Sequence, residues 1–337
     1  QNIQEEPHKR RVRYKGKYPR NYKEKYKELN PEKYQDTIEK VIRKGSTPAG
    51  MHISIMVREI IDFLQIKPGQ TGFDATLGYG GHTKAMLECL KGQGHMYATD
   101  VDPIESAKTK KRLADAGFGE DILTIRLQNF CTIDEIAKEA GGFDFVLADL
   151  GVSSMQIDNP DRGFSFKVDG PLDLRLNPEK GISAAERLAQ IEEGELAGML
   201  WENSDEPYAE ELAHAIVTER KHGKPIDTTT RLREVIEETL SFLPEKEKKD
   251  TVKKTCQRTF QALRIDVNNE FEVLYEFMEK LPGALKPGGR AAILTFHSGE
   301  DKLVKKALKQ GYKEGVYSEI ANDVVRPSAE ECAQNGR

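Results

Sequence analysis

The feature that most constrains the fold is a regular alternation of strand and helix patterns between residues 71 and 150. Short apolar stretches typical of strands lie at 71–77, 95–100, 122–127 and 143–150. Helical patterns lie before and between them at 55–64, 83–90, 103–116 and from 133. The last apolar stretch is hydrophobic on both faces, which is typical of a parallel sheet covered by helices on both sides. We therefore expect an α/β fold.

The alternation stops after residue 150 and returns only near residue 268. The intervening segment contains a polar loop at 159–178 and helical patterns at 183–190, 208–221 and 230–240. A helix at 268–281, a turn at 285–290 and a strand at 291–296 then resume the sheet pattern. This predicts a basic N-terminal extension (1–50), a first part of the core (51–155), a helical insertion or substrate domain (156–258) and a second part of the core (259–337).

A glycine loop, Gly78-Tyr-Gly-Gly-His82, follows the first predicted strand. Such a loop lets backbone N–H groups and a helix N-terminus approach a nucleotide-like ligand. The dinucleotide fingerprint has a third glycine where this chain has Thr83, which weakens the case for NAD. Asp100 ends the second predicted strand, where a carboxylate can accept both ribose hydroxyls of NAD or of S-adenosylmethionine. The alternative is an ordinary tight turn with a solvated acid.

The charge of the chain is unevenly distributed. The net charge is −5, yet residues 1–50 hold 14 lysines and arginines against 7 acids, so the extension carries +7 and the remainder −12. Four tyrosines recur every four residues among these cations, at Tyr14, Tyr18, Tyr22 and Tyr26. Aromatic rings can stack on bases while cations contact phosphates, so the arm fits a nucleic-acid partner. The alternative is a basic tail whose tyrosines dock on the body.

Several classes of protein are disfavoured by the sequence. The four cysteines lie far apart, without a Cys-x-x-Cys pair or a histidine cluster, so we expect neither a zinc site nor a disulfide framework. No apolar run approaches the length of a membrane span, and the first twenty residues carry charges where a secretory signal is apolar. We expect no membrane, no metal and a reducing, cytoplasmic compartment.

Six ordered blocks carry a more specific signal. They are Asp74-Ala-Thr-Leu-Gly-Tyr-Gly-Gly-His82, Asp149-Leu-Gly-Val-Ser-Ser-Met-Gln-Ile-Asp158, Arg162-Gly-Phe-Ser-Phe166, Gly170-Pro-Leu-Asp-Leu-Arg175, Phe260-Gln-Ala-Leu-Arg264 and Phe296-His-Ser298. Together they resemble the family of small-subunit 16S rRNA cytosine-N(4)-methyltransferases, of the MraW or RsmH type. The resemblance covers residues 51–298 and implies a class I, Rossmann-like methyltransferase sheet with a helical insertion domain. It also implies S-adenosyl-L-methionine as methyl donor and a decoding-region cytidine of the small ribosomal subunit as acceptor.

Residue roles follow from matching these blocks. The resemblance implies that the cofactor is bound by Gly78, Gly80, Gly81, His82, Asp100, Phe130, Asp149 and Gln156. It implies substrate contacts from Ser153, Ser154, Arg162, Phe164, Phe166, Arg175 and Arg264, and catalytic positions at Asp149, His297 and Ser298. Asp149 closes an apolar parallel strand at the ligand edge of the sheet, where it could accept a hydrogen bond from the cytosine amine.

The other candidates each have a structural alternative. Phe164 and Phe166 either stack on an extruded base or pack in a core. The three arginines either contact phosphates or pair with nearby carboxylates. His297 either positions the site, acts as a general base or is a structural histidine. His82, Phe130 and Gln156 could instead be a helix start, a core ring and a surface turn.

Two departures from the family pattern stand out. Gly299 replaces the usual apolar residue after His-Ser, and the sequence ends at Arg337, where relatives typically continue with a basic segment. Two other functions stay open at this point: a methyltransferase acting on another nucleic-acid acceptor, and a non-catalytic S-adenosylmethionine-binding protein of ribosome assembly. The sequence leaves the oligomeric state open, a dimer included.

Overall fold

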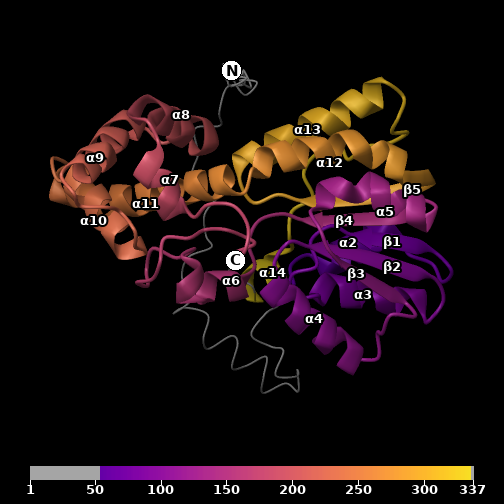
Figure 1. Cartoon of the computed structure of the whole chain (residues 1–337). Helices are drawn as coiled ribbons and strands as arrows, with labels where there is room; N and C mark the ends of the chain where they lie inside the picture. The colour runs from indigo at the N-terminus through magenta and orange to yellow at the C-terminus, as the bar shows by residue number, and fades with distance from the viewer. Residues whose placement is uncertain (1–53, 335–337) are drawn as a thin grey trace, which may run out of the picture.

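A computed structural model describes residues 54–334 of the chain, and the basic arm predicted at 1–50 lies outside them. Within the described residues, five parallel strands form one sheet in the order β3-β2-β1-β4-β5 (Figure 1). The strands are β1 (Thr71–Asp74), β2 (His95–Asp100), β3 (Leu123–Leu127), β4 (Phe143–Asp149) and β5 (Leu285–Leu294). Because all five run in one direction, their carboxyl ends meet at one edge, and β1 lies at the centre of that edge.

Helices cover both faces of the sheet, as the apolar β4 requires. They are α2 (Val57–Leu64), α3 (Gly81–Leu90), α4 (Pro103–Asp115), α5 (Ile133–Ala140), α12 (Glu270–Ala284) and α13 (Ser298–Lys313). Phe73 and Val146 belong to the buried cluster that includes residues of α5, α12 and α13, whereas Phe145 and Leu147 belong to the one that includes residues of α2, α3 and α4. The predicted α/β class is therefore confirmed.

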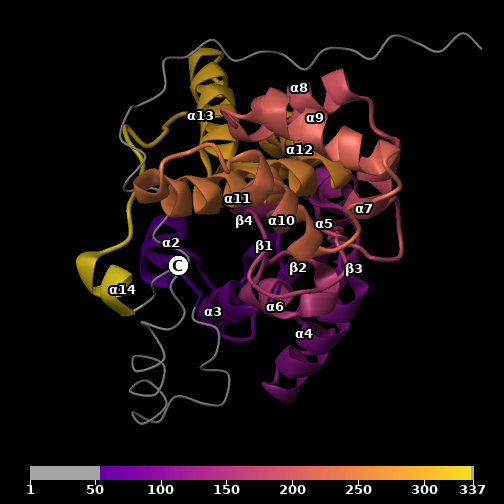
Figure 2. The ribbon, with the colours of Figure 1, turned by 90° about the vertical axis from the view of Figure 1, so that its left-hand side faces the viewer.

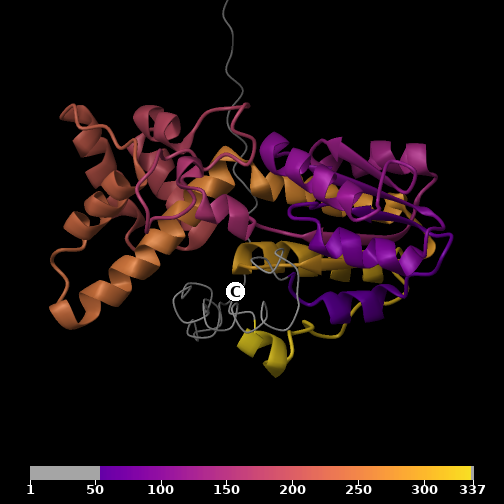
Figure 3. The same ribbon diagram turned by 90° about the horizontal axis from the view of Figure 1, so that it is seen from below.

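The insertion forms a second lobe beside the sheet. It begins with α6 (Ser154–Asp158) and the 3-10 turn η5 (Pro160–Arg162). Its helices are α7 (Ala184–Gln190), α8 (Glu193–Ser204), α9 (Ala209–Lys221), α10 (Thr229–Thr239) and α11 (Glu245–Val267). These helices enclose a separate apolar cluster. Seen from below, the lobe lies to one side of the sheet, and α11 leads out of it towards α12 (Figure 3).

Most predicted elements agree with the structure to within a few residues, with two corrections. The predicted turn at 285–290 is wrong: these residues belong to β5, which pairs with β4 through a register shift between Phe143 and Phe145. Pro287 is tolerated there because β5 is the outermost described strand on its side. Three helices were not predicted: α8 at 193–204, α11 at 245–267 and α13 at 298–313.

The boundary predicted between residues 258 and 259 falls inside α11, a continuous helix of 23 residues. Its buried positions, including Cys256 and Phe260, belong to the apolar cluster of the insertion. The division into domains stays a prediction, and α11 is the element that its two parts would share. The short helix α14 (Ala329–Gln334) lies near α2, where the N–H of Met56 donates to Glu331. No helix among residues 54–334 is long and apolar enough to cross a membrane.

Candidate active site

The glycine loop connects β1 to α3 at the centre of the carboxyl edge. The structure begins α3 at Gly81, two residues earlier than predicted, and gives Gly78 and Gly80 positive φ angles of 51° and 88°. A Cβ atom on Gly80 would lie 2.7 Å from the Thr109 side chain. Glycine is therefore required there both by the backbone angle and by the close approach of α4.

Helix α4 holds this loop in place from behind. The Thr109 hydroxyl donates to the Gly78 carbonyl, and Nη2 of Arg112 donates to the Tyr79 carbonyl at 3.0 Å. The Arg112 guanidinium also lies 3.7 Å from the centre of the Tyr79 ring, a cation–π contact. Sequence reasoning missed Thr109 and Arg112, because neither belongs to a motif and their contacts are made between elements.

Asp100 ends β2 directly opposite the loop. Its carboxylate accepts from the N–H of Gly78 at 3.2 Å and from the N–H of Asp102 at 3.0 Å. Burial raises the pKa of Asp100 to about 6, and the charges of Asp102 and Glu105 act in the same direction. The side chain is therefore mostly ionised at neutral pH and close to its titration range.

Asp149 ends β4 on the other side of β1. Its N–H donates to the Thr76 hydroxyl at 2.7 Å, and its carboxylate, 28% exposed, lies 3.4 Å from Nδ1 of His82. Nε2 of His82 is 2.7 Å from the Ile55 carbonyl. Burial alone would lower the pKa of His82, but the hydrogen bond and charge of Asp149 outweigh it and raise the pKa. The pair places a partly exposed carboxylate beside the glycine loop.

Asp74 anchors the start of the loop from inside. It is fully buried, and its two oxygens accept from the N–H of Thr76 at 3.0 Å and the hydroxyl of Thr83 at 2.5 Å. Burial raises the pKa of Asp74. Thr83, the residue that departs from the dinucleotide fingerprint, thus ties α3 to the end of β1.

Comparison with known sequences decides the family. The sequence pattern of the MraW methylase family matches residues 49–337. The chain belongs to the MraW methylase family. It is 81% identical to "Ribosomal RNA small subunit methyltransferase H 1" of Agathobacter rectalis, over 99% of this chain and 96% of that protein. It is 71% identical to the protein of that name from Lachnoclostridium phytofermentans, over 99% and 91%.

The remaining predicted site residues of this MraW methylase lie around the turn after β4. Ser153 caps α6, because its hydroxyl accepts from the N–H of Gln156 at 3.2 Å while the Gln156 amide oxygen accepts from the N–H of Ser153 at 3.0 Å. The Gln156 amide also donates to Asp102 at 2.9 Å, and Ser154 is buried. Figure 2 shows α6 next to α4.

The two phenylalanines of the loop pack towards the insertion. Phe166 lies 5.6 Å from Phe260 of α11, measured between ring centres, and both Phe164 and Phe166 contact the apolar cluster of the insertion. Phe164 is also near the guanidinium of Arg162, at 5.9 Å. These contacts correspond to the core alternative rather than to base stacking.

The three predicted arginines are paired with carboxylates. Arg162 is 4% exposed and pairs with Asp102 at 2.8 Å. Arg175 pairs with Asp173 at 2.7 Å, and Arg264 pairs with Glu270 at 2.9 Å. The enclosed guanidinium of Arg162 corresponds to the alternative of carboxylate pairing, and its contact with a phosphate stays a prediction.

His297 and Ser298 lie where β5 leads into α13. His297 is buried, accepts from the N–H of Glu300 at 3.4 Å and has Nε2 at 2.8 Å from the Glu300 carboxylate. A Cβ atom on Gly299 would lie 2.6 Å from the Phe271 ring. Phe271 therefore occupies the space of the apolar side chain that this chain lacks at position 299.

Phe130 begins the 3-10 turn η4 (Phe130–Thr132) after β3, at the other end of the carboxyl edge. Its ring packs edge-on against Phe277 of α12, with ring centres 5.2 Å apart, and remains partly exposed. One side of the Phe130 ring therefore packs in the core, while part of the ring stays exposed. Among residues 54–334, no cluster of histidine, cysteine and acidic side chains could hold a metal ion.

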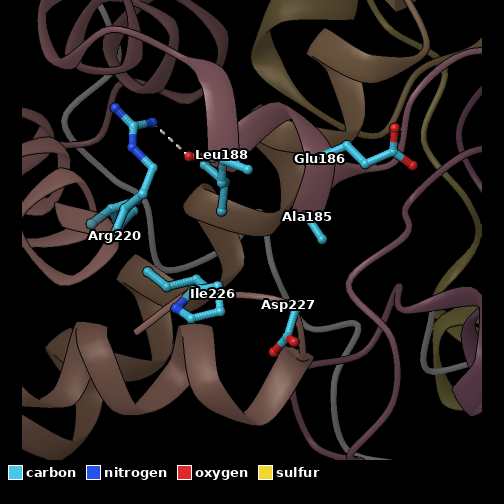
Figure 4. Close-up of a pocket in the computed structure, with 9 residues that line it drawn as sticks. Ala185, Glu186, Leu188, Arg220, Ile226 and Asp227 are labelled. Carbon is cyan, nitrogen blue, oxygen red and sulfur yellow. Dashed lines mark hydrogen bonds between the residues drawn. The ribbon is translucent and has the colours of Figure 1, made fainter. Parts of the chain in front are cut away.

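A cavity of about 230 Å³ lies away from this edge, inside the insertion (Figure 4). Leu188 of α7, Ile216 of α9 and Ile226 form part of its wall, and Nη1 of Arg220 donates to the Leu188 carbonyl at 2.8 Å. It shares no residue with the glycine loop or the ends of β2 and β4.

Proposed function

We propose that this MraW methylase transfers the methyl group of S-adenosyl-L-methionine to the exocyclic 4-amino nitrogen of a cytidine in the decoding region of 16S rRNA. The family match over 49–337 and the names of the relatives, small-subunit rRNA methyltransferases, support the class of acceptor. The six sequence blocks that resemble cytosine-N(4)-methyltransferases support the assignment of the 4-amino nitrogen as the methylated atom. The partner is then the small ribosomal subunit, and the compartment is the cytoplasm.

The edge formed by β1, β2 and β3 suits the donor. The Asp100 carboxylate would accept from the ribose hydroxyls, and the loop from Gly78 to His82 would pass along the ribose and methionine. The exposed side of Phe130 would flank the adenine, with Gln156 closing the pocket. Bound there, the donor supplies a methyl group already activated by its sulfonium centre.

The observation that carries the proposal is the partly exposed Asp149 carboxylate beside the glycine loop. The cytosine amine is a weak nucleophile because its lone pair is delocalised into the ring. Asp149 would accept a hydrogen bond from the amine and orient its lone pair towards the methyl group. His82, which contacts Asp149, would hold that carboxylate in place.

The other candidates have supporting parts in the proposal. Ser153 and Ser154 start α6 beside Asp149 and would border the base. His297 and Ser298 would position the end of β5. Arg175 and Arg264 could contact phosphates only by exchanging their partners Asp173 and Glu270.

A direct test uses purified protein, small ribosomal subunits and S-adenosylmethionine carrying an isotopically labelled methyl group. After digestion of the 16S rRNA to nucleosides, the label should appear in N4-methylcytidine. Label in a different nucleoside, or none in rRNA, would contradict the proposal.

A further inference from the structure

A buried carboxylate, Asp102, connects the sheet to the insertion loop, and the family resemblance gives it no role. It is fully buried, and one oxygen caps α4 by accepting from the N–H groups of Ile104 and Glu105 at 3.0 and 3.3 Å. Its other oxygen accepts from the Gln156 amide at 2.9 Å and the Arg162 guanidinium at 2.8 Å. One side chain thus joins α4, α6 and η5.

Arg162 extends this connection into the loop that follows. Its Nη2 donates to the carbonyls of Arg175 at 3.2 Å and Leu176 at 2.9 Å. The N–H of Leu176 in turn donates to the Asn268 side chain at 2.8 Å. Both ends of the loop at 159–178 are therefore held by one buried guanidinium, itself held by Asp102.

The same network reaches the ribose end of the donor site. The N–H of Asp102 donates to Asp100 at 3.0 Å, so the position of Asp102 helps to fix the Asp100 carboxylate. Any displacement of Asp102 would move this N–H group and with it the hydrogen bond to Asp100. Asp100, Asp102 and Arg162 thus form one continuous chain of contacts from the sheet edge to the insertion loop.

We propose, on the basis of the function proposed above, that Asp102 and Arg162 are positioning residues of the donor site, through which the insertion loop holds Asp100 in place for the ribose hydroxyls. Neither residue touches the donor. Each acts by fixing the position and the electrostatic surroundings of Asp100. The insertion loop at 159–178 and the turn after β2 that would bind the donor therefore form one structural unit.

The charges around Asp100 make this role measurable. From α4, Asp102 and Glu105 both raise the pKa of Asp100, after the larger effect of burial. Lys108, Arg112 and Arg162 counter the charge of Glu105. Because Arg162 also balances Asp102, its removal would leave an uncompensated negative charge beside Asp100.

The test is the dissociation constant of S-adenosylmethionine between pH 5 and pH 8, measured by calorimetry. In the wild type, affinity should weaken as the pH falls through about 6, because protonated Asp100 no longer accepts two hydrogen bonds. Arg162→Met should move the midpoint of the loss about one pH unit higher, the change that one pKa unit produces, so binding near pH 5 should be about tenfold weaker than in the wild type while binding at pH 7.5 changes less than twofold. Arg162→Lys, which keeps the charge, should keep the midpoint.

Asp102→Asn should shift the pH midpoint in the opposite direction to Arg162→Met. Asparagine still caps α4 through its amide oxygen, but its NH2 group would face the Gln156 and Arg162 donors. The variant should therefore be less stable than the wild type, and a native circular dichroism spectrum is required before binding is measured. With the negative charge removed, the midpoint should move to lower pH than in the wild type. If Arg162→Met fails to fold, the pH midpoint of Asp102→Asn alone tests the positioning role.

Arg258→Met is the matched control. Arg258 pairs with the fully buried Glu206 inside the insertion, at 3.7 Å. Neither residue belongs to the chain of contacts that joins Asp100, Asp102 and Arg162. This variant should lower the melting temperature without moving the pH midpoint. Equal midpoints in wild type, Arg162→Met and Asp102→Asn would overturn the positioning role while leaving the proposed function intact. A wild type that does not bind S-adenosylmethionine would overturn the proposed function itself, and this role with it.

Discussion

At the scale of single residues, the carboxylates that end β2 and β4 are prepared for different tasks. The Asp100 carboxylate accepts hydrogen bonds from two backbone N–H groups and is partly buried, and burial raises its pKa to about 6. Asp149 uses its N–H to bind Thr76 and leaves its carboxylate between His82 and open space. The first arrangement suits recognition of hydroxyl groups, and the second suits contact with an acceptor.

Replacing Asp149 with asparagine should separate folding from turnover. Asparagine keeps an acceptor oxygen but loses the negative charge that stabilises the amine as it becomes positive, so we expect methyl transfer to fall about 100-fold while the circular dichroism spectrum stays native. Asp144→Asn is the control on the same strand, since Asp144 lies near the opposite end of β4 and contacts Lys286 and the N–H of Thr71. Near-normal turnover in Asp149→Asn would remove this residue from the mechanism.

Binding of the donor should depend on the ionisation of Asp100. Above its pKa the carboxylate accepts from both ribose hydroxyls, and below it the protonated form loses part of that capacity, so affinity should fall as the pH drops through about 6. Asp100→Ala should bind about ten- to a hundredfold more weakly at pH 7.5, since a hydrogen bond to a charged group contributes about 1.5–3 kcal/mol. Calorimetry measures both. An alanine variant as tight as the wild type would contradict the assignment.

The strand-end carboxylates could be predicted from the sequence, but their supports could not. Asp100 and Asp149 follow from the strand pattern, because the ends of parallel strands meet at one edge. Asp102, Thr109 and Arg112 act through contacts between elements, which no periodicity encodes. For Asp102 a signal existed: an aspartate directly before Pro103 is typical of a helix start.

At the scale of elements, the start of α13 is shaped by its contact with α12. Gly299 lies so close to Phe271 that any side chain would overlap the ring. The sequence alone showed the glycine as a departure from the family, and only the packing explains it. Similarly, α8 and α11 were not predicted, because their buried faces are defined only by the helices that pack against them.

We expect Gly299→Val to destabilise the protein by about 1–3 kcal/mol, the usual cost of overpacking. Phe271→Leu should relieve part of this cost when combined with it, because the smaller side chain vacates the contested space. Urea unfolding of the two single variants and the double variant measures the coupling. Strictly additive effects would show that Phe271 does not determine the residue at position 299.

At the scale of the whole molecule, the insertion lies to one side of the sheet (Figure 3). The boundary between these two lobes is built from α11, α6 and the buried Asp102–Arg162 pair. The sequence predicted an insertion, because the strand–helix alternation stops and returns. It could not show how the insertion attaches, since the predicted boundary falls inside a continuous 23-residue helix.

The basic arm at 1–50 should contribute to binding of the small subunit. A chain that starts at Met51 loses a net charge of +7, so it should bind more weakly and show a shallower fall of log affinity with log salt concentration. Affinity for S-adenosylmethionine should stay unchanged. An unaltered salt slope with a lower melting temperature would instead mean that the arm packs on the body.

The tyrosines of the arm allow a finer test. Replacing Tyr14, Tyr18, Tyr22 and Tyr26 with leucine keeps apolar docking but removes the rings that stack on bases. Reduced affinity for the subunit with an unchanged salt slope is expected. Retained affinity would leave charge as the sole contribution of the arm.

The most direct measurement of the central claim is nucleoside mass spectrometry of 16S rRNA from cells that lack the gene. One N4-methylated cytidine of the decoding region should lose that methyl group, the wild-type gene should restore it and the Asp149→Asn gene should not. An unchanged set of cytidine modifications in the deleted strain would contradict this claim, as would full restoration by the Asp149→Asn gene.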